Sequence, residues 1–420
     1  MAEKIVLANG VRVLLEPIAH LRSVCMGIWV AAGSRLEGPE EKGMAHFIEH
    51  MLFKGTRRRS AQRIAWEIDA VGGVLNAFTS REYSSFYVKV MDEHLPLAVD
   101  LITDLYLNSI FDPTELERER CVVLQEIRMV EDTPEEHVMD LFHEAMWKGS
   151  SMAHPIQGES EQVARMPREF LVEKWASHYH HKEVLFSVAG NFHEKNLLEL
   201  LENSAGCLCA VPNWPQKKTP ESNPGLKLVE KDLEQVHVCL GVPAPHMTHP
   251  DRYAFYLLNT ILGGGMSSRL FQEIREKRGL AYSVYSFLSS YADTGILGVY
   301  LGTTRQELKE ALEVILEQME ELRDTPVSQE VIESAREQVK GGLVLGLESS
   351  DRRMGRQAQN ELYFGRDVSV EEVIEALEKE SPNSVQSAAQ QAFVPEKMTG
   401  VILGRASLAD IPNPLRNWVM

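Results

Sequence analysis

The segment His46-Phe47-Ile48-Glu49-His50 carries two histidines and one glutamate at helical spacing. Residues three and four positions apart lie on one face of a helix, so His46, Glu49 and His50 are expected to point the same way. Two imidazoles one turn apart form a pair of zinc ligands, and a neighbouring carboxylate can hold and deprotonate a water on the metal. The order is inverted relative to H-E-x-x-H, but the geometry is kept because the carboxylate only moves to the other end of the turn. We therefore predict a zinc-binding helix here.

A third zinc ligand is expected from another helix, because catalytic zinc takes three protein ligands and leaves one position for water. Residues 116–127 have a helical pattern, and Glu119 and Glu126, seven positions apart, share one of its faces. We predict Glu126 as the third ligand. For Glu119 we predict a carboxylate that orients a ligand from behind, with a solvated helix face as the alternative.

These residues, together with further blocks along the chain, resemble the inverted-motif zinc peptidases, the family of pitrilysin, insulin-degrading enzyme and the mitochondrial processing peptidase. Glu126 follows His50 by 76 positions, and the further blocks occur in the family's order and run nearly from end to end; they are residues 76–83, 116–127, 262–271 and 275–282. The resemblance is closest to the two-domain members that are similar to the processing peptidase. It implies a duplicated α+β fold, each half a mostly antiparallel sheet packed with helices.

The overall composition limits the possible partners. With 420 residues the chain is long enough for two or more domains. Its net charge of −18 argues against nucleic acid or an anionic membrane as a partner, because a phosphate-binding surface needs positive charge. No apolar run approaches the roughly 20 residues that cross a bilayer, and residues 1–10 resemble neither a signal peptide nor a transit peptide. We expect a cytoplasmic protein.

The pattern of elements predicts two halves of the same construction. Residues 1–211 are expected to form a zinc-binding domain and residues 226–420 a second domain, joined by a linker at 212–225 that contains four prolines. A repeat of roughly 200 residues is too long for a solenoid unit and indicates a duplicated domain. Asp112-Pro113 in the first half and Thr325-Pro326 in the second are each expected to open a helix.

The second half has no counterpart of the zinc motif. When residues 53–55 are aligned with 262–264, the three motif positions fall on Phe255, Leu258 and Asn259, which suit a packing helix. We therefore expect one zinc ion per chain.

The resemblance assigns roles to four further residues outside the zinc motif. Arg275 and Tyr282 match the residues that reach from the zinc-free half to the substrate, their alternative being one more surface arginine and one more buried tyrosine. Asn76 and Ala77 match the edge strand to which an extended peptide adds through main-chain hydrogen bonds, a mode that recognises backbone more than sequence.

Two acidic residues follow Glu126 on what is expected to be a helical segment. Glu136 and Asp140 lie where the processing peptidase presents acidic residues to basic presequences, and together they could pair with one arginine of a peptide. The alternative is an acidic surface that only keeps the protein soluble.

These observations predict a zinc endopeptidase for peptides or unfolded polypeptides, with Glu49 as the general base. One alternative is a non-catalytic scaffold, like the core subunits of a respiratory complex that share this fold, and another is one subunit of a hetero-oligomeric peptidase. Long family members enclose a chamber with four such domains, so a chain with two domains is expected to form a homodimer that closes like a clamshell.

Overall fold

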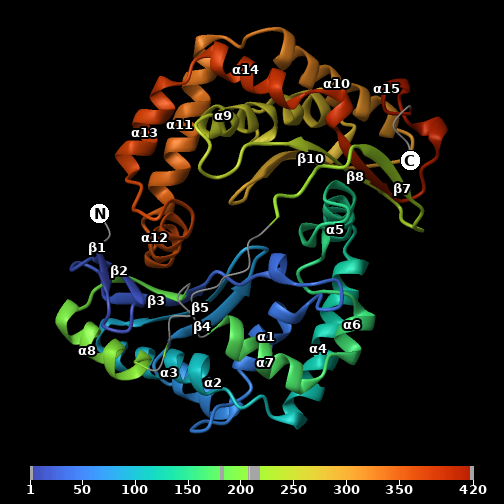
Figure 1. Ribbon diagram of the computed structural model, residues 1–420. Helices are drawn as coiled ribbons and strands as arrows, with labels where there is room; N and C mark the ends of the chain where they lie inside the picture. Colours follow the sequence, from blue (N-terminus) through green and yellow to red (C-terminus); the bar gives the residue numbers. More distant parts are fainter. Residues whose placement is uncertain (1–2, 180–183, 207, 209–217, 417–420) are drawn as a thin grey trace. The chain divides into compact units, whose positions relative to one another are not determined.

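The computed structural model describes residues 3–179, 184–206, 208 and 218–416 (Figure 1). The chain forms two compact units, and each unit is built on one sheet. The first unit takes Met1–Met129, His154–Lys217 and Gly346–Ser369, and the second takes Val130–Ala153, Lys218–Leu345 and Val370–Met420.

The sheet of the first unit has the strand order β1-β2-β6-β3-β5-β4. β2 and β6 are parallel and the other neighbours are antiparallel, so β4 is an edge strand. The bounds are β1 (Glu3–Val6), β2 (Arg12–Pro17), β3 (Ser23–Val30), β4 (Val74–Thr79), β5 (Ser84–Met91) and β6 (Val184–Gly190).

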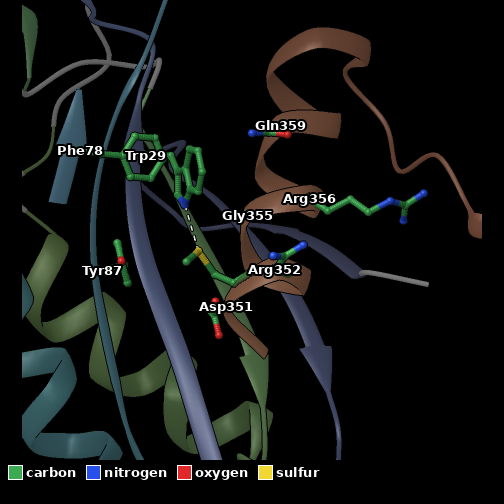
Figure 2. A pocket seen from close by; sticks show the side chains of 9 residues that line it. Trp29, Phe78, Tyr87, Asp351, Arg352, Gly355, Arg356 and Gln359 are labelled. Atoms are coloured by element: carbon green, nitrogen blue, oxygen red, sulfur yellow. Dashed lines mark hydrogen bonds between the residues drawn. The ribbon is translucent and has the colours of Figure 1, made fainter. Parts of the chain in front are cut away.

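One face of this sheet is covered by a single helix, α12 (Ser350–Phe364), which arrives from the C-terminal half of the sequence. Ser187 of β6 donates a hydrogen bond to the backbone carbonyl of Met354. Trp29 of β3 donates through its indole nitrogen to the Met354 sulfur (Figure 2). Gly27 of β3 leaves space for the Met354 sulfur, because a Cβ at this position would lie 2.7 Å from it. The close approach of α12 to the sheet therefore depends on the glycine at position 27.

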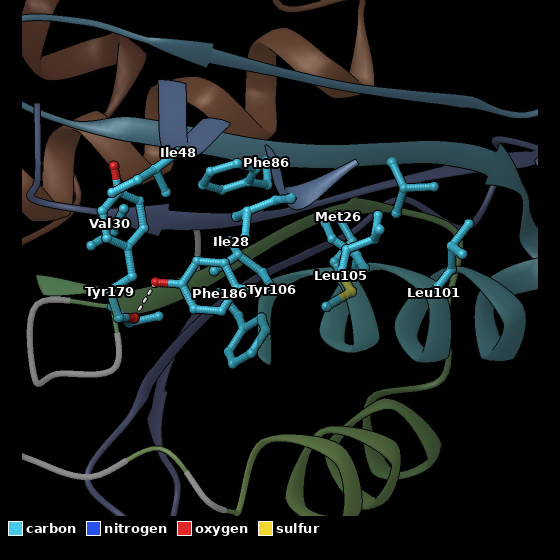
Figure 3. Close-up of a cluster of buried hydrophobic side chains, with 14 of the residues drawn as sticks. Met26, Ile28, Val30, Ile48, Phe86, Leu101, Leu105, Tyr106, Tyr179 and Phe186 are labelled. Atoms are coloured by element: carbon cyan, nitrogen blue, oxygen red, sulfur yellow. Dashed lines mark hydrogen bonds between the residues drawn. The ribbon is translucent and has the colours of Figure 1, made fainter. Parts of the chain in front are cut away.

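The opposite face carries the main core of the unit. Figure 3 shows Met26, Ile28 and Phe186 of the strands against Leu101 and Leu105 of helix α3. The helices of this unit are α1 (Met44–Leu52), α2 (Ala61–Asp69), α3 (Leu95–Asn108), α4 (Pro113–Asp132, whose last residues belong to the second unit), α6 (Ser160–Arg165), α7 (Arg168–His178) and α8 (Glu194–Ala205), with 3-10 turns at η1 (Ser34–Leu36) and η2 (Asp92–His94).

The second unit repeats this plan. Its sheet has the order β7-β11-β8-β10-β9, with β7 (Gly225–Val229), β8 (Val236–Pro243), β9 (Ala281–Ser290), β10 (Gly295–Thr303) and β11 (Thr399–Leu403). Its helices are α5 (Pro134–Met146), α9 (Arg252–Gly263), α10 (Leu308–Asp324), α11 (Gln329–Gly346), α13 (Val370–Lys379), α14 (Pro382–Ala392) and α15 (Asn413–Arg416), with short turns at η3 (Ser151–Ala153), η4 (Phe271–Glu276, a π-helix), η5 (Pro395–Lys397) and η6 (Leu408–Asp410).

The predicted duplication is confirmed by strand topology. In chain order, β2 to β6 occupy the same positions and have the same parallel and antiparallel neighbours as β7 to β11. α9 follows β8 as α1 follows β3, and its Phe255 and Leu258 are buried in the core of the second unit.

The compact units do not follow the sequential division at residues 211 and 226. α5 packs on β8 and β11 of the second sheet, whereas α12 packs on β2, β3 and β6 of the first. Each sheet thus takes its covering helix from the other half of the sequence. The predicted linker lies partly outside the described residues, and its described part, residues 218–224, forms neither helix nor strand. None of the described helices has the length and apolar character needed to cross a membrane.

Candidate metal centre

Helix α1 places the histidine motif at the surface of the first unit. Phe47 and Ile48 are buried in the core, which leaves His46, Glu49 and His50 together on the half-buried side of the helix. The predicted common face of the motif is therefore present.

A buried carboxylate holds the start of this helix. The Glu37 side chain accepts backbone N–H hydrogen bonds from Gly43 at 2.9 Å and from Ala45 at 2.8 Å. These are donors that a helix N-terminus leaves unsatisfied, so Glu37 serves in place of a side-chain N-cap. Burial raises the pKa of Glu37 to about 8, although both backbone hydrogen bonds lower it.

Helix α4 supplies the acidic side of the site. Asp112 caps its first turn by accepting from the backbone N–H groups of Thr114 and Glu115. Val123 is fully buried in the core, which fixes the rotation of the helix. Glu119 is also buried, whereas Glu126 is half exposed.

The two histidines and Glu126 converge within the first unit. A carboxylate oxygen of Glu126 lies 3.7 Å from Nε2 of His46 and 3.4 Å from Nε2 of His50. Among the described residues, these three form the group whose ligand atoms all lie within 4.8 Å of one another. A tetrahedral zinc ion with bonds of about 2.0–2.2 Å separates neighbouring ligand atoms by about 3.3–3.6 Å. Two imidazoles and a carboxylate in this arrangement therefore fit zinc.

Glu119 contacts the rear nitrogen of His50. Its carboxylate lies 3.0 Å from Nδ1 of His50 and 2.6 Å from the ammonium group of Lys54. Burial raises the pKa of Glu119, but the hydrogen bonds from His50 and Lys54 outweigh burial and hold the pKa below its usual value. An ionised carboxylate only accepts hydrogen bonds, so Nδ1 of His50 donates to Glu119 and Nε2 is the nitrogen directed toward Glu126.

The two histidines differ in their electrostatic environment. Burial and the nearby His50 lower the pKa of His46 to about 3, so His46 is a neutral imidazole. For His50, burial lowers the pKa, but the hydrogen bond to Glu119 and the charge of Glu126 raise it further than burial lowers it. A metal ion would therefore meet little competition from protons at His46, whereas at His50 it would compete with a proton that Glu119 and Glu126 stabilise.

Glu49 is held by the end of strand β4. The hydroxyl of Thr79 donates to the Glu49 carboxylate at 2.5 Å. Burial raises the pKa of Glu49, the hydrogen bond from Thr79 and the nearby His50 lower it, and Glu126 raises it; the net shift of the pKa is upward. A half-buried carboxylate with a raised pKa is suited to accept and return a proton.

Asn76 and Ala77 lie on β4, the edge of the sheet. The backbone N–H of Ala77 donates to the side-chain oxygen of its neighbour Asn76 at 2.8 Å. This N–H is therefore directed to the outer edge of β4, where an added strand could receive it.

The other predicted site residues belong to the second unit. Arg275 donates to the backbone carbonyl of Tyr282 at 3.1 Å, and its guanidinium lies 4.4 Å from the centre of the Tyr282 ring. Tyr282 is 78% exposed, so the alternative of a buried tyrosine is wrong. Glu136 is exposed and Asp140 half-buried on α5. The roles of all four residues stay predictions.

Sequence reasoning missed three residues that support this site: Glu37, Lys54 and Thr79. Lys54 follows His50 by four positions and Thr79 follows Ala77 by two, so helical and strand periodicity could have placed both on the correct faces. Glu37 gave no local signal, because it lies in the loop before α1 and accepts hydrogen bonds from residues six and eight positions further along the chain.

Comparisons with family models and with known proteins point to the same family. The family model "Insulinase (Peptidase family M16)" matches residues 12–160, and "Peptidase M16 inactive domain" matches residues 165–339. The chain is 39% identical to the "Uncharacterized zinc protease YmxG" of Bacillus subtilis, over 96% of this chain and 98% of that protein. The chain belongs to the M16 peptidase family. This is the pitrilysin family of zinc metallopeptidases that the sequence motifs resemble.

Further proteins are similar over nearly the whole length of the chain. An uncharacterized zinc protease of Mycobacterium tuberculosis is 38% identical over 98% of this chain and 95% of its own length. A protease from Helicobacter pylori has the same fold, with a TM-score of 0.90 at 22% identity over 96% of this chain and 99% of that one. A structure from Pseudomonas fluorescens described as a peptidase M16 inactive domain gives a TM-score of 0.88 at 19% identity, over 96% and 98% of the two chains. A particular closeness to the mitochondrial processing peptidase stays a prediction.

Proposed function

We propose that this M16 protein is a zinc-dependent endopeptidase that hydrolyses peptides or unfolded polypeptides. The observation that carries the proposal is the convergence of His46, His50 and Glu126, with the Glu49 carboxylate on the same face of α1 as the two histidines. The names of the curated relatives, which describe them as zinc proteases, support the same metal and reaction class.

The two histidines and Glu126 would hold the ion, one per chain, and Glu119 would orient His50 through its hydrogen bond. When bound, zinc would polarise the substrate carbonyl and acidify the attacking water. Glu49 would take the proton of that water and pass it to the leaving amine, and the upward shift of its pKa makes it a stronger base for the first transfer. Thr79 would keep the Glu49 carboxylate directed at the reaction through its hydrogen bond.

The edge of β4 supports recognition of an extended peptide. An incoming carbonyl would replace the Asn76 side chain as the acceptor for the Ala77 N–H. Because Thr79 binds Glu49, a peptide aligned along β4 would lead to the general base. Recognition through backbone fits substrates that lack a fixed fold.

Arg275 and Tyr282 are proposed to contact the substrate at the transition state, although sequence resemblance alone carries this role. The exposed Tyr282 ring, stacked with the Arg275 guanidinium, offers a hydroxyl and a cation on one surface. These are the donor types that a developing oxyanion needs.

A preference for basic peptides is proposed from the net charge of −18 and from Glu136 and Asp140 on α5. Such steering weakens as salt screens the charges. Matched peptides that carry lysine or glutamate beside the cleaved bond, compared at low and high salt, test this. Equal cleavage at low salt would leave the two residues with a role in solubility only.

The direct test of the proposed activity is hydrolysis of a quenched fluorescent peptide by the zinc-loaded protein and its Glu49→Gln variant. We expect the parent protein to cut within the peptide and a chelator to abolish cleavage. Glu49→Gln should retain zinc and lose nearly all activity, because an amide cannot accept the proton. Parental activity in the variant would reject Glu49 as the base. A zinc-loaded parent that cuts no peptide would favour the scaffold or the hetero-oligomeric subunit.

A further inference from the structure

A pocket of about 360 Å³ lies within the first unit, between α12 and the strands at the β4 side of the sheet (Figure 2). Pockets that bind ligands usually span about 300–1,000 Å³, so this one suits a single large side chain better than a whole metabolite. It is lined by Trp29, Phe78, Tyr87, Asp351, Arg352, Met354, Gly355, Arg356 and Gln359. None of these residues belongs to the metal centre.

The floor of the pocket is aromatic. Trp29, Phe78 and Tyr87 come from the adjacent strands β3, β4 and β5 and share one face of the sheet. The Trp29 and Phe78 rings meet edge to face, with centroids 5.6 Å apart and an interplanar angle of 81°. Phe78 is 38% exposed although it is a large apolar residue, so the floor is left partly uncovered at the edge strand. An aromatic ring that enters the pocket could pack edge to face or in an offset stack against these rings.

The wall formed by α12 leaves room for such a ring. The Met354 sulfur is engaged by the Trp29 indole at 3.1 Å, which fixes the helix against the floor. The next residue is Gly355, where an added Cβ would lie 3.8 Å from the Trp29 ring and a longer side chain would extend into the pocket. The helix therefore carries its smallest residue where it borders the aromatic floor.

The charge at the rim is positive. Asp351 is neutralised by Lys89 at 2.9 Å. Arg356 extends away from Trp29 in Figure 2 and donates to the backbone carbonyl of Val368. Arg352 is exposed, and among the described residues its guanidinium has no hydrogen bond or ion pair. A free guanidinium beside aromatic rings attracts a further ring through cation–π contact and repels a lysine or arginine.

The edge strand connects this pocket with the proposed catalytic residues. Neighbouring residues of a strand point to opposite faces, so Phe78 faces the pocket while Thr79 faces Glu49. A strand added to β4 would alternate in the same way, because opposed residues share a face. Every second side chain of a bound peptide would thus lie on the face of the sheet that carries the pocket.

We infer that this pocket is a specificity subsite that takes an aromatic side chain of a peptide bound along β4 and disfavours lysine and arginine at that position. The inference rests on the proposed function, because it assumes that β4 receives the peptide. It concerns one position of the peptide and leaves a basic preference at other positions unaffected.

The test is direct binding of short fluorescent peptides to the Glu49→Gln protein in the presence of a chelator, so that neither zinc nor hydrolysis contributes. One position at a time carries alanine, phenylalanine, lysine or glutamate. At one register we expect phenylalanine to lower Kd about tenfold relative to alanine, part of the gain from burying a ring being lost to ordering. Lysine there should bind more weakly than alanine.

Two variants and one control variant test whether the effect arises in the pocket. Gly355→Leu fills the pocket and should abolish the gain from phenylalanine, whereas Gly342→Leu, the same change in exposed space on α11, should leave it intact. Arg352→Glu should remove the penalty for lysine. A flat response to phenylalanine, a gain that survives in Gly355→Leu, or a stronger preference for glutamate than for phenylalanine would each overturn the inference. If the parent protein hydrolyses peptides and any of these results is found, the subsite fails while the proposed function stands.

Discussion

Glu37 is a carboxylate with little access to water, placed against the positive end of the helix that carries the histidine motif. Its two backbone hydrogen bonds, from Gly43 and Ala45, fix the first turn of α1, which contains His46. The position of a metal ligand thus depends on a side chain that does not touch the metal site.

This burial predicts a pH-dependent stability. The pKa of Glu37 is about 8 in the folded protein and about 4.3 in an unfolded chain. Between these values the folded state holds a proton that the unfolded state has released, so stability falls as pH rises and levels off above about pH 8. Glu37→Gln cannot titrate, and its Tm should fall less from pH 5 to pH 8 than that of the parent protein.

Calorimetry with a chelator present measures this, because zinc binding then adds no pH dependence of its own. The exposed Glu40→Gln serves as the control and should follow the parent protein. Parallel Tm profiles for Glu37→Gln and the parent protein would contradict the assigned burial.

Glu119 gives a second prediction at the residue scale. Glu119→Gln keeps the size of the side chain but removes the charge that fixes the tautomer of His50, and losses of this kind usually weaken metal affinity about 10–100-fold. Lys54→Met should weaken it less, because Lys54 acts on His50 indirectly, through its ion pair with Glu119. Competition with a zinc-binding dye measures both affinities, and unchanged affinity in Glu119→Gln would contradict the role of Glu119 in orienting His50.

At the scale of elements, the edge strand makes one main-chain donor testable. Ala77→Pro removes an N–H that does not pair with β5, and proline is tolerated at such edge positions. The loss of one hydrogen bond should raise KM several-fold with little change in kcat or zinc content. A variant with parental KM would show that the peptide does not use this edge.

Two helix starts show what local sequence patterns can and cannot predict. Asp112-Pro113 opens α4 as predicted, because Asp112 accepts from two backbone N–H groups of the first turn. Thr325-Pro326 was expected to do the same, but α11 begins at Gln329, with Ser328 beside the N–H of Val331. A serine three residues later supplied an alternative cap, and propensity alone does not choose between two caps.

The three proposed metal-binding residues could be predicted from the sequence more readily than the rest of the fold around them. Spacing within α1 and resemblance over α4 pointed to His46, His50 and Glu126, which the structure brings together in the first unit. The aromatic pocket was not predicted, because it requires α12 of the second half of the sequence to cover the first sheet. Strand order and helix exchange depend on contacts between distant residues, which periodicity does not record.

At the scale of the whole molecule, the chain contains two units on one plan and one described metal group. Since the family's chamber needs four such units, we predict a homodimer, with twice the 47.4 kDa mass of one chain. Sedimentation at the concentration of the peptidase assay measures this mass. A fully active species with the mass of one chain would contradict the dimer and the four-domain chamber.

The most direct test of the proposed metal site is the zinc content of the purified protein and of a set of matched variants. We predict one zinc per chain in the parent protein and in Glu49→Gln. Glu117→Gln, which changes an exposed glutamate on the same helix as Glu126, should also retain zinc. His46→Ala and Glu126→Ala should lose it while remaining folded by circular dichroism. A full zinc content in folded His46→Ala and Glu126→Ala would contradict the assigned metal site and the mechanism built on it.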